Sequence, residues 1–315
     1  MTFSERVKSE ILTKNITSPC CRVAGLSAFV RGAGTILVEG GNVGFEIKSE
    51  NDKACKFYAD ILKKDFNETA EITTTTDKFN GKNKFSLKYI SNKSAEVLLS
   101  LGIIERSAGG VALNLAIDKY LIEDKCCKKA YIASAFIGSG SVTVPSKDTK
   151  SSTGYHLEFN FSQYYTAMDF SILLTEEGFF PKVTSRKESF VVYFKTCEEI
   201  RNLLFYLGAT KCCFDLDNIV IENDIRNDTN RRINCEMANI DKQILASQKQ
   251  IASIRVIQET IGIDSLPTQL QDAIKLRLEN QESTLEELSK LAGVSKSCFN
   301  HRMRKIVEIS KNLKN

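Results

Sequence analysis

A short stretch that occurs twice constrains the fold of this chain more than any other feature. CCRVAGLSAFVRGAGTI at residues 20–36 returns as CCKKAYIASAFIGSGSV at residues 126–142, with the paired cysteines and the late glycines in register. Within each copy, small residues recur at helical spacing, which predicts a helix with one narrow stripe of small side chains. Two such helices can cross with their backbones close together, so we expect a pseudo-two-fold helix pair at the centre of a duplicated domain. The stripes are Ala24, Ala28 and Gly32 in the first copy and Ala130, Ser134 and Gly138 in the second.

Both copies lead into the same succession of patterns. Two strand-like runs follow each copy, and then come a helical run, a second pair of strand-like runs and a closing helix. The order expected in each half is therefore α-β-β-α-β-β-α. The middle helices are predicted at residues 51–65 and 163–177, and the closing helices at residues 94–101 and 197–207.

A duplicated helix that ends in a small residue, any residue and glycine, and then leads into strands, resembles the LAGLIDADG homing endonuclease fold. The resemblance covers about residues 20–220. It implies an α+β domain in which the two helices form the central interface and the sheets form a saddle for DNA. In an active member of that family, the residue before the final glycine of each motif is Asp or Glu, and the two carboxylates hold divalent metals.

In this chain those two positions hold Ala33 and Ser139. Neither side chain supplies the negative charge that a hard cation requires. Glu39 and Asp148 lie downstream, but they would have to replace both helix-end ligands symmetrically. We therefore expect a nuclease scaffold without its chemistry: degenerate metal positions, no catalytic residues, no metal and no cofactor.

The composition fits a soluble protein of about two or three domains. The chain has 315 residues, of which 42% are hydrophobic, and a formal net charge of +4. The N-terminal segment MTFSERVKSEILTKN is charged throughout, and no run of about eighteen apolar residues occurs, so we expect a cytoplasmic protein with no membrane partner. No phosphate-binding glycine loop and no nucleophile elbow is found, which argues against an enzyme.

The cysteines give no metal motif at the level of sequence. None of the ten stands in a C-x-x-C arrangement, and the chain has two histidines. That spacing does not fit a zinc module, and vicinal pairs are poorly placed to close a disulfide. We expect buried structural thiols, with a metal or redox role as the alternative. The cysteines are Cys20, Cys21, Cys55, Cys126, Cys127, Cys197, Cys212, Cys213, Cys235 and Cys298.

A change in composition after the second repeat predicts a linker. Residues 221–262 are polar and rich in asparagine, so their first part is expected to be a poor helix and their last part, from Asn239, a helix with an isoleucine face. The cluster Arg226, Arg231 and Arg232 forms either a solvated face or a contact to DNA phosphates. The predicted division is residues 1–220, with repeats at about 20–102 and 126–220, then the linker at 221–262 and a last domain at 263–315.

The last domain has the pattern of a helix-turn-helix. A first helix follows Pro267, a second begins at Ser283 or Thr284, the chain turns sharply at residues 292–294, and Ser295 caps a third helix that runs to about residue 312. The third helix is expected to face the first two through Phe299, Met303, Ile306 and Ser310.

The third helix is also strongly basic, and we predict that it contacts DNA. Side chains near the start of such a helix reach base edges in the major groove, where Asn300 suits adenine and Arg304 suits guanine. Other basic residues are better placed for phosphates. The alternative is a basic helix that docks on a protein. The predicted DNA-binding residues are Lys296, Ser297, Asn300, His301, Arg302, Arg304 and Lys305.

Together, the inactive repeat pair, the segment RRINCEMANIDK and the terminal LEELSKLAGVSKSCFNHRMRKI resemble the bacterial WhiA proteins over essentially the full chain. The terminal segment is similar to the helix-turn-helix of sigma-factor region four. The resemblance implies a nucleoid-associated regulator of transcription that binds double-stranded DNA and acts in sporulation, cell division or chromosome segregation. Two alternatives stay open: a metal-dependent endonuclease, and a regulator that docks on RNA polymerase or another transcription regulator.

Overall fold

The described residues of the computed structural model form two compact units. These residues are 1–12, 14, 16–76, 83–107, 110–145 and 154–313. The first unit spans Met1–Ile221 and the second Glu222–Asn315. Each unit has its own hydrophobic core, and the core residues run from Val7 to Leu216 in the first and from Ile254 to Ile306 in the second.

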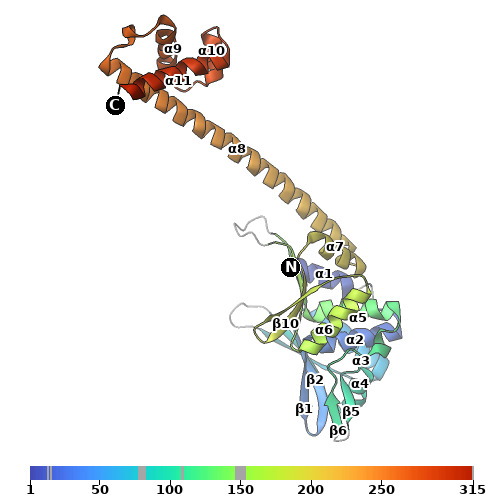
Figure 1. Ribbon diagram of the computed structural model, residues 1–315. Helices are drawn as coiled ribbons and strands as arrows, with labels where there is room; N and C mark the ends of the chain where they lie inside the picture. The colour runs from blue at the N-terminus through green and yellow to red at the C-terminus, as the bar shows by residue number, and fades with distance from the viewer. Residues whose placement is uncertain (13, 15, 77–82, 108–109, 146–153, 314–315) are drawn as a thin grey trace. The chain divides into compact units, whose positions relative to one another are not determined.

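The first unit contains two repeats with the order α-β-β-α-β-β-α, which confirms the prediction (Figure 1). The first repeat consists of α2 (Pro19–Ala33), β1 (Gly34–Glu39), β2 (Asn42–Ser49), α3 (Asp52–Phe66), β3 (Glu71–Thr76), β4 (Asn83–Tyr89) and α4 (Ser94–Ser100). The second consists of α5 (Lys125–Ser139), β7 (Gly140–Thr143), β8 (His156–Phe161), α6 (Tyr164–Glu176), β9 (Lys182–Arg186), β10 (Ser189–Phe194) and α7 (Cys197–Tyr206). Before and between them lie α1 (Phe3–Leu12), β5 (Ile104–Ser107), β6 (Gly110–Leu113) and the 3-10 helix η1 (Lys119–Ile122).

Each repeat folds its four strands into one antiparallel sheet. The strand orders are β1-β2-β4-β3 and β7-β8-β10-β9, so the two sheets share one topology. Alternate side chains of a strand point to opposite faces, and Phe45 of β2 and Phe159 of β8 are fully buried. Glu46 and Glu158, one position away, are only half-buried on the opposite faces. Each repeat therefore has a sheet with one apolar, covered face and one polar face.

Helices α2 and α5 pack against each other at the centre of the first unit, as the small-residue stripes predict. Ala24, Ala28, Ala130 and Ser134 are at most 1% exposed. The approach is so close that a Cβ atom added at Gly25 would lie 2.7 Å from Oγ of Ser134, and one added at Gly138 would lie 3.2 Å from the ring of Phe29. The two repeats are therefore joined through a pair of helices that leave no room for larger side chains.

The expectation that the first part of the linker forms a poor helix is wrong. Helix α8 spans Thr210–Thr260 without interruption, although every residue from 224 to 246 is exposed. The segment holds no glycine or proline, asparagine costs less than about 0.7 kcal/mol per residue, and a helix already nucleated gains one hydrogen bond for each residue added. The predicted isoleucine face is divided: Ile254 and Ile257 are buried, whereas Ile240 and Ile244 are about half exposed.

The second unit packs the end of α8 against three helices. After the 3-10 helix η2 (Ile263–Ser265) come α9 (Thr268–Glu279), α10 (Leu285–Leu291) and α11 (Lys296–Asn312). The second core joins Ile254 and Ile257 of α8 to the apolar sides of these helices. The shared core residues are Leu270, Ala273, Ile274, Leu288, Phe299, Met303 and Ile306.

The tight crossing of α2 and α5 predicts a large effect of volume at Gly25. We expect Gly25→Val to lower the free energy of unfolding of the first unit by about 1–3 kcal/mol, because the added methyl groups overpack the interface with Ser134. Gly154→Val is the matched control, since nothing lies within 4 Å of a Cβ atom added there. Chemical denaturation followed by circular dichroism measures both. Equal stability of the two variants would contradict the close approach.

Candidate nucleic-acid interface

The helix-turn-helix is formed by local signals that cap α10 and α11. Thr284 closes a capping box on α10: its backbone N–H donates to Glu287 at 2.7 Å and its hydroxyl accepts from the Glu287 N–H at 3.2 Å. Gly293, with φ +65°, ends α10, and the hydroxyl of Ser295 accepts from the Cys298 N–H at 3.2 Å to start α11. Ser289, where alanine is common, is buried and donates to the Glu286 carbonyl at 2.8 Å. The hydroxyl of Ser289 is therefore hydrogen-bonded within α10 although the residue is buried.

One face of α11 is in the core, as predicted. Phe299, Met303 and Ile306 are fully buried and Ser310 is 3% exposed. The spacings of four, three and four residues place these side chains within one narrow arc of the helix. The opposite face is therefore free to contact a partner.

The structure divides the predicted DNA-binding residues into a central group and two edges. The exposed residues are Lys296, Ser297, His301, Arg304 and Lys305. Asn300 and Arg302 are half-buried. At about 100° per residue, these two side chains leave α11 on opposite flanks, about 160° apart. Both edges of the exposed face therefore carry a polar side chain.

Lys296 is less available for a contact with DNA than its position in the sequence suggests. Its Nζ lies 3.3 Å from a carboxylate oxygen of Glu286, and Lys290 lies 3.6 Å from the other oxygen. The hydrogen bond from Lys296 holds the pKa of Glu286 below its usual range. Within the described part of the chain, no carboxylate comes within ion-pairing distance of Arg302, Arg304 or Lys305. On α11, the basic residues without an ion pair among the described residues therefore follow the first turn.

Two further lysines outside the predicted DNA-binding residues lie beside this face, and one of them, Lys249, comes from a different helix. A groove of about 460 Å³ between α8 and α11 is lined by Lys249, Arg304, Glu308 and Lys311. Lys249 comes from α8, in the turns that lead to the buried Ile254. The apolar pair Ile254 and Ile257 was the available signal, because it predicts that α8 docks on the last domain. The basic face therefore extends from α11 onto α8.

Ala33 and Ser139, which the sequence analysis predicts to be degenerate metal positions, are packed at the ends of α2 and α5. A Cβ atom added at Gly138 would lie 3.4 Å from Cβ of Ala33, and one at Gly32 would lie 3.1 Å from Oγ of Ser139. The Ser139 hydroxyl donates to the Ala135 carbonyl of its own helix at 3.0 Å. Of the downstream acids, Glu39 pairs with a lysine, and Asp148 lies outside the described residues. No acidic pair replaces the missing carboxylates in the described part of the chain.

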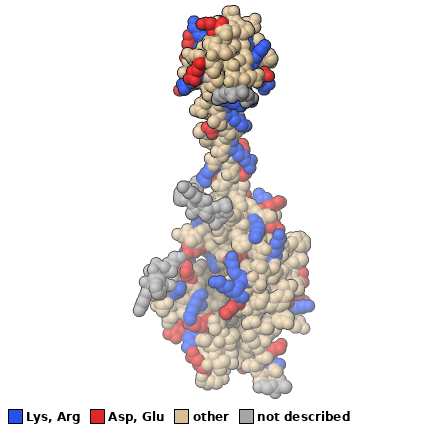
Figure 2. Space-filling view, turned by 60° about the vertical axis from the view of Figure 1, so that its left-hand side comes forward, with Lys and Arg blue, Asp and Glu red and all other residues tan. Residues whose placement is uncertain are grey.

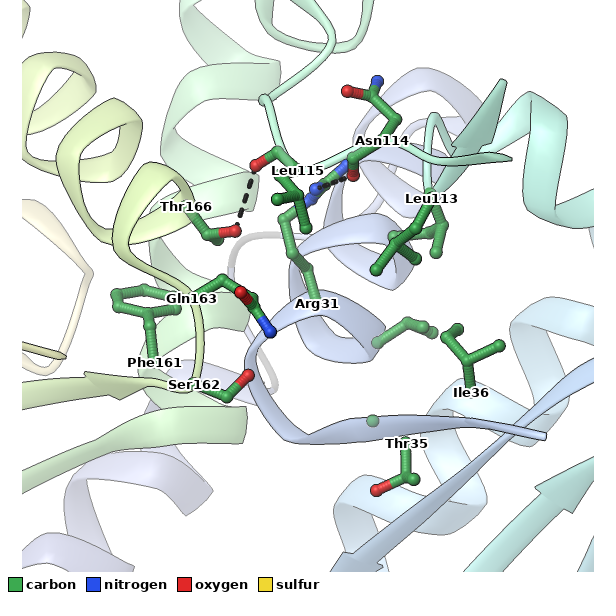
Figure 3. A pocket seen from close by; sticks show the side chains of 13 residues that line it. Arg31, Thr35, Ile36, Leu113, Asn114, Leu115, Phe161, Ser162, Gln163 and Thr166 are labelled. Atoms are coloured by element: carbon green, nitrogen blue, oxygen red, sulfur yellow. Dashed lines mark hydrogen bonds between the residues drawn. The ribbon is translucent and has the colours of Figure 1, made fainter. Parts of the chain in front are cut away.

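A cavity of about 380 Å³ lies beside the end of α2, and no acidic residue is among the described residues that line it (Figure 3). Arg31 reaches across its upper part and donates to the carbonyls of Asn114 and Gly102, both at 2.7 Å. On the other side, the Thr166 hydroxyl donates to the Leu115 carbonyl at 3.0 Å. A lining with a guanidinium and without carboxylates does not suit a hard divalent cation.

The polar faces of the sheets carry charges of both signs that pair with one another. Lys88 lies 2.8 Å from Glu39, which raises the pKa of Lys88, and Lys48 lies 3.3 Å from Glu46. On the second sheet, Glu158 accepts from His156 at 2.9 Å. Figure 2 shows blue and red side chains interspersed on the face of the first unit turned to the viewer. These faces therefore lack the one-sign field that attracts a polyanion.

Four cysteines correct the expectation of buried thiols. Cys20, Cys126, Cys235 and Cys298 are exposed. In addition, two vicinal pairs meet, Cys20 with Cys21 and Cys126 with Cys127. All four of their Sγ atoms lie within 4.8 Å of one another. The sequence spacing concealed this group because each helix supplies one half of it.

No helix among the described residues is long and apolar enough to cross a membrane.

Comparison with known proteins divides the chain into three matched parts. Residues 19–104 match the family model for the WhiA N-terminal LAGLIDADG-like domain, residues 128–226 the WhiA LAGLIDADG-like domain, and residues 229–310 the WhiA C-terminal HTH domain. Curated relatives named probable cell division protein WhiA are similar over almost their full length. The relative from Caldicellulosiruptor saccharolyticus is 33% identical, with 100% of this chain and 96% of the relative covered. The one from Clostridium acetobutylicum is 36% identical, with 100% and 99% covered.

Among solved structures, the full-length WhiA protein from Thermatoga maritima has a similar fold. The TM-score is 0.56, the sequence identity is 22%, and the match covers 99% of each chain.

Proposed function

The chain belongs to the WhiA family, and from that premise we propose that it is a sequence-specific DNA-binding regulator of cell division, chromosome segregation or sporulation. One observation carries the proposal: α11 presents Arg304 and Lys305, exposed and without an ion pair among the described residues, from a capped helix-turn-helix. That arrangement matches the way a recognition helix enters the major groove. Such a protein acts at the nucleoid on double-stranded DNA.

We assign roles to the residues of the basic face by their place on α11. His301 and Arg304 lie near the middle of the exposed arc, where a side chain reaches base edges, and Arg304 suits guanine. Asn300 suits adenine at one edge of the arc. Lys305, with Lys249 and Lys311 along the neighbouring groove, is placed for phosphates. Lys296 contributes less, since Glu286 partly neutralises it.

We further propose that the chain is not an enzyme. Ala33 and Ser139 provide no carboxylate at the two helix ends, and the Ser139 hydroxyl is bonded to its own helix. The WhiA relatives are named as cell division proteins rather than nucleases. Docking on RNA polymerase or another regulator is the remaining alternative, and co-purification from nuclease-treated cells would favour it.

Separate roles for bases and phosphates predict different effects of neighbouring substitutions. With an operator derived from a genome-wide binding footprint, Arg304→Ala should cost about 1–3 kcal/mol of binding free energy and relax the preference at one base pair. Lys305→Ala should weaken binding to all sequences evenly and reduce the salt slope by about one. Fluorescence anisotropy on operator and random duplexes at several salt concentrations measures both. Equal losses on both duplexes for both variants would reject these roles.

The missing carboxylates predict that supercoiled plasmid and operator duplex stay intact in magnesium or manganese. Gel electrophoresis after long incubation tests this, with a chelator-treated sample as the control. Site-specific nicking that the chelator abolishes would overturn the non-enzymatic assignment.

Each unit has its own hydrophobic core, so we expect each to fold as a separate fragment. DNA binding can then be assigned to one unit. We expect a fragment of residues 222–315 to retain the sequence preference of the whole chain, because it carries the unpaired basic face. A fragment of residues 1–221 should bind duplex weakly and without preference, since Lys48 and Lys88 on its first sheet are paired with acids. Gel-shift titrations at two salt concentrations compare the fragments with the full chain. Tight, selective binding by the first fragment would make the sheets the reader instead.

A further inference from the structure

The four-cysteine group lies in the first unit, where the two repeats begin. Cys20 and Cys21 occupy the first turn of α2, directly after Pro19, and Cys126 and Cys127 occupy the same positions of α5, directly after Lys125. The pseudo-two-fold crossing of α2 and α5 thus brings two equivalent pairs together. In each pair one thiol is exposed and the next is buried, with Cys21 3% and Cys127 4% exposed. The arrangement is symmetrical and open to solvent at one side.

The distances within the group fit a single metal ion. A tetrahedral ion with Zn–S bonds of about 2.3 Å separates its sulfur ligands by about 3.8 Å. The four Sγ atoms already lie within 4.8 Å of one another, so small rotations of the side chains close the site. An iron–sulfur cluster also takes four thiolates, but it places several metal atoms between them and needs a wider arrangement. The observed spacing therefore favours one ion over a cluster.

We propose that Cys20, Cys21, Cys126 and Cys127 bind one Zn²⁺ ion that links the two repeats. All four ligands are sulfur, which selects soft or borderline cations, and a closed set of four thiolates is typical of a structural zinc site rather than a catalytic one. As the four Zn–S bonds form, the thiol protons pass to solvent and no electrons move. For these four cysteines, the proposal takes the metal role that the sequence analysis gave as the alternative to buried, metal-free thiols.

The surroundings of the group suit the charge of such a site. Four thiolates around Zn²⁺ leave two net negative charges, and the positive ends of two helix dipoles point at them, because all four ligands lie in the first turns of α2 and α5. The side chain of Ser18, which caps α2, is within hydrogen-bond distance of the Cys20 Sγ at 3.2 Å. The two helix dipoles and the Ser18 side chain therefore favour thiolates at this place.

Metal analysis of the full-length chain tests the proposal. The protein is purified under reducing conditions without a nickel column or chelator, and its metal content is measured by mass spectrometry after zinc is offered and excess removed. We expect about one zinc per chain, and a thermal melting temperature that falls when a strong chelator is added. Cobalt(II) in place of zinc should give the visible absorption of tetrahedral thiolate coordination.

Matched variants separate this site from adventitious binding to thiols. Cys20→Ser with Cys126→Ser removes one exposed ligand from each helix, so the fold should be preserved and zinc content should fall roughly tenfold or more. Cys235→Ser with Cys298→Ser changes two exposed cysteines outside the group and should leave zinc content unchanged. Circular dichroism checks that both variants fold.

Three outcomes would overturn the zinc site. The first is a wild-type chain with free thiols and no bound zinc after zinc is offered. The second is equal zinc content in both double variants. The third is an intact mass that shows loss of thiol hydrogens in these four cysteines under reducing conditions, which would identify disulfides between the two repeats. None of these results bears on DNA binding by α11, so the proposed function is tested separately.

Discussion

The close approach of α2 and α5 is the constraint on which the first unit depends. Because Gly25 and Ser134 face each other with no space for a further carbon atom, the two helices have one available register. That register places the two sheets in equivalent positions, brings Ala33 and Ser139 together at one end of the pair, and brings the vicinal cysteines together at the other. A duplicated sequence becomes one domain through this contact.

The same contact also fits the small side chains that stand at the C-terminal ends of α2 and α5. At the helix ends, Ala33 and Ser139 each pack beside a glycine of the opposite helix, and Ser139 satisfies its hydroxyl on its own backbone. Carboxylates there would bring two like charges into a confined space, which is unfavourable unless a cation lies between them. Small neutral side chains at Ala33 and Ser139 avoid that repulsion, so the helix crossing needs no cation between the helix ends.

Local patterns in the sequence predict the order of the helices and strands. They do not predict contacts between segments that are distant in the sequence. The period of the apolar residues located both repeats and the core face of α11, since Phe299, Met303 and Ile306 are spaced as a helix requires. The asparagine content of α8 predicts a poor helix, but the segment has no glycine or proline and the helix is continuous. The Lys296–Glu286 pair, Lys249 beside Arg304, and the meeting of the cysteines each join residues from different helices, which no local pattern reports.

The exposed middle of α8 has a consequence for local stability. Between residues 224 and 246 the helix has no buried side chain, so tertiary packing supports it only where Leu216 and Ile254 enter the two cores. Most helical stability in proteins comes from such packing, and an isolated helix is marginal in water. Amide hydrogens in this middle stretch should therefore exchange with solvent long before those of either core, and opening there need not disturb α11 or the paired helices α2 and α5. The two cores and the middle of α8 thus open as separate cooperative units of one chain.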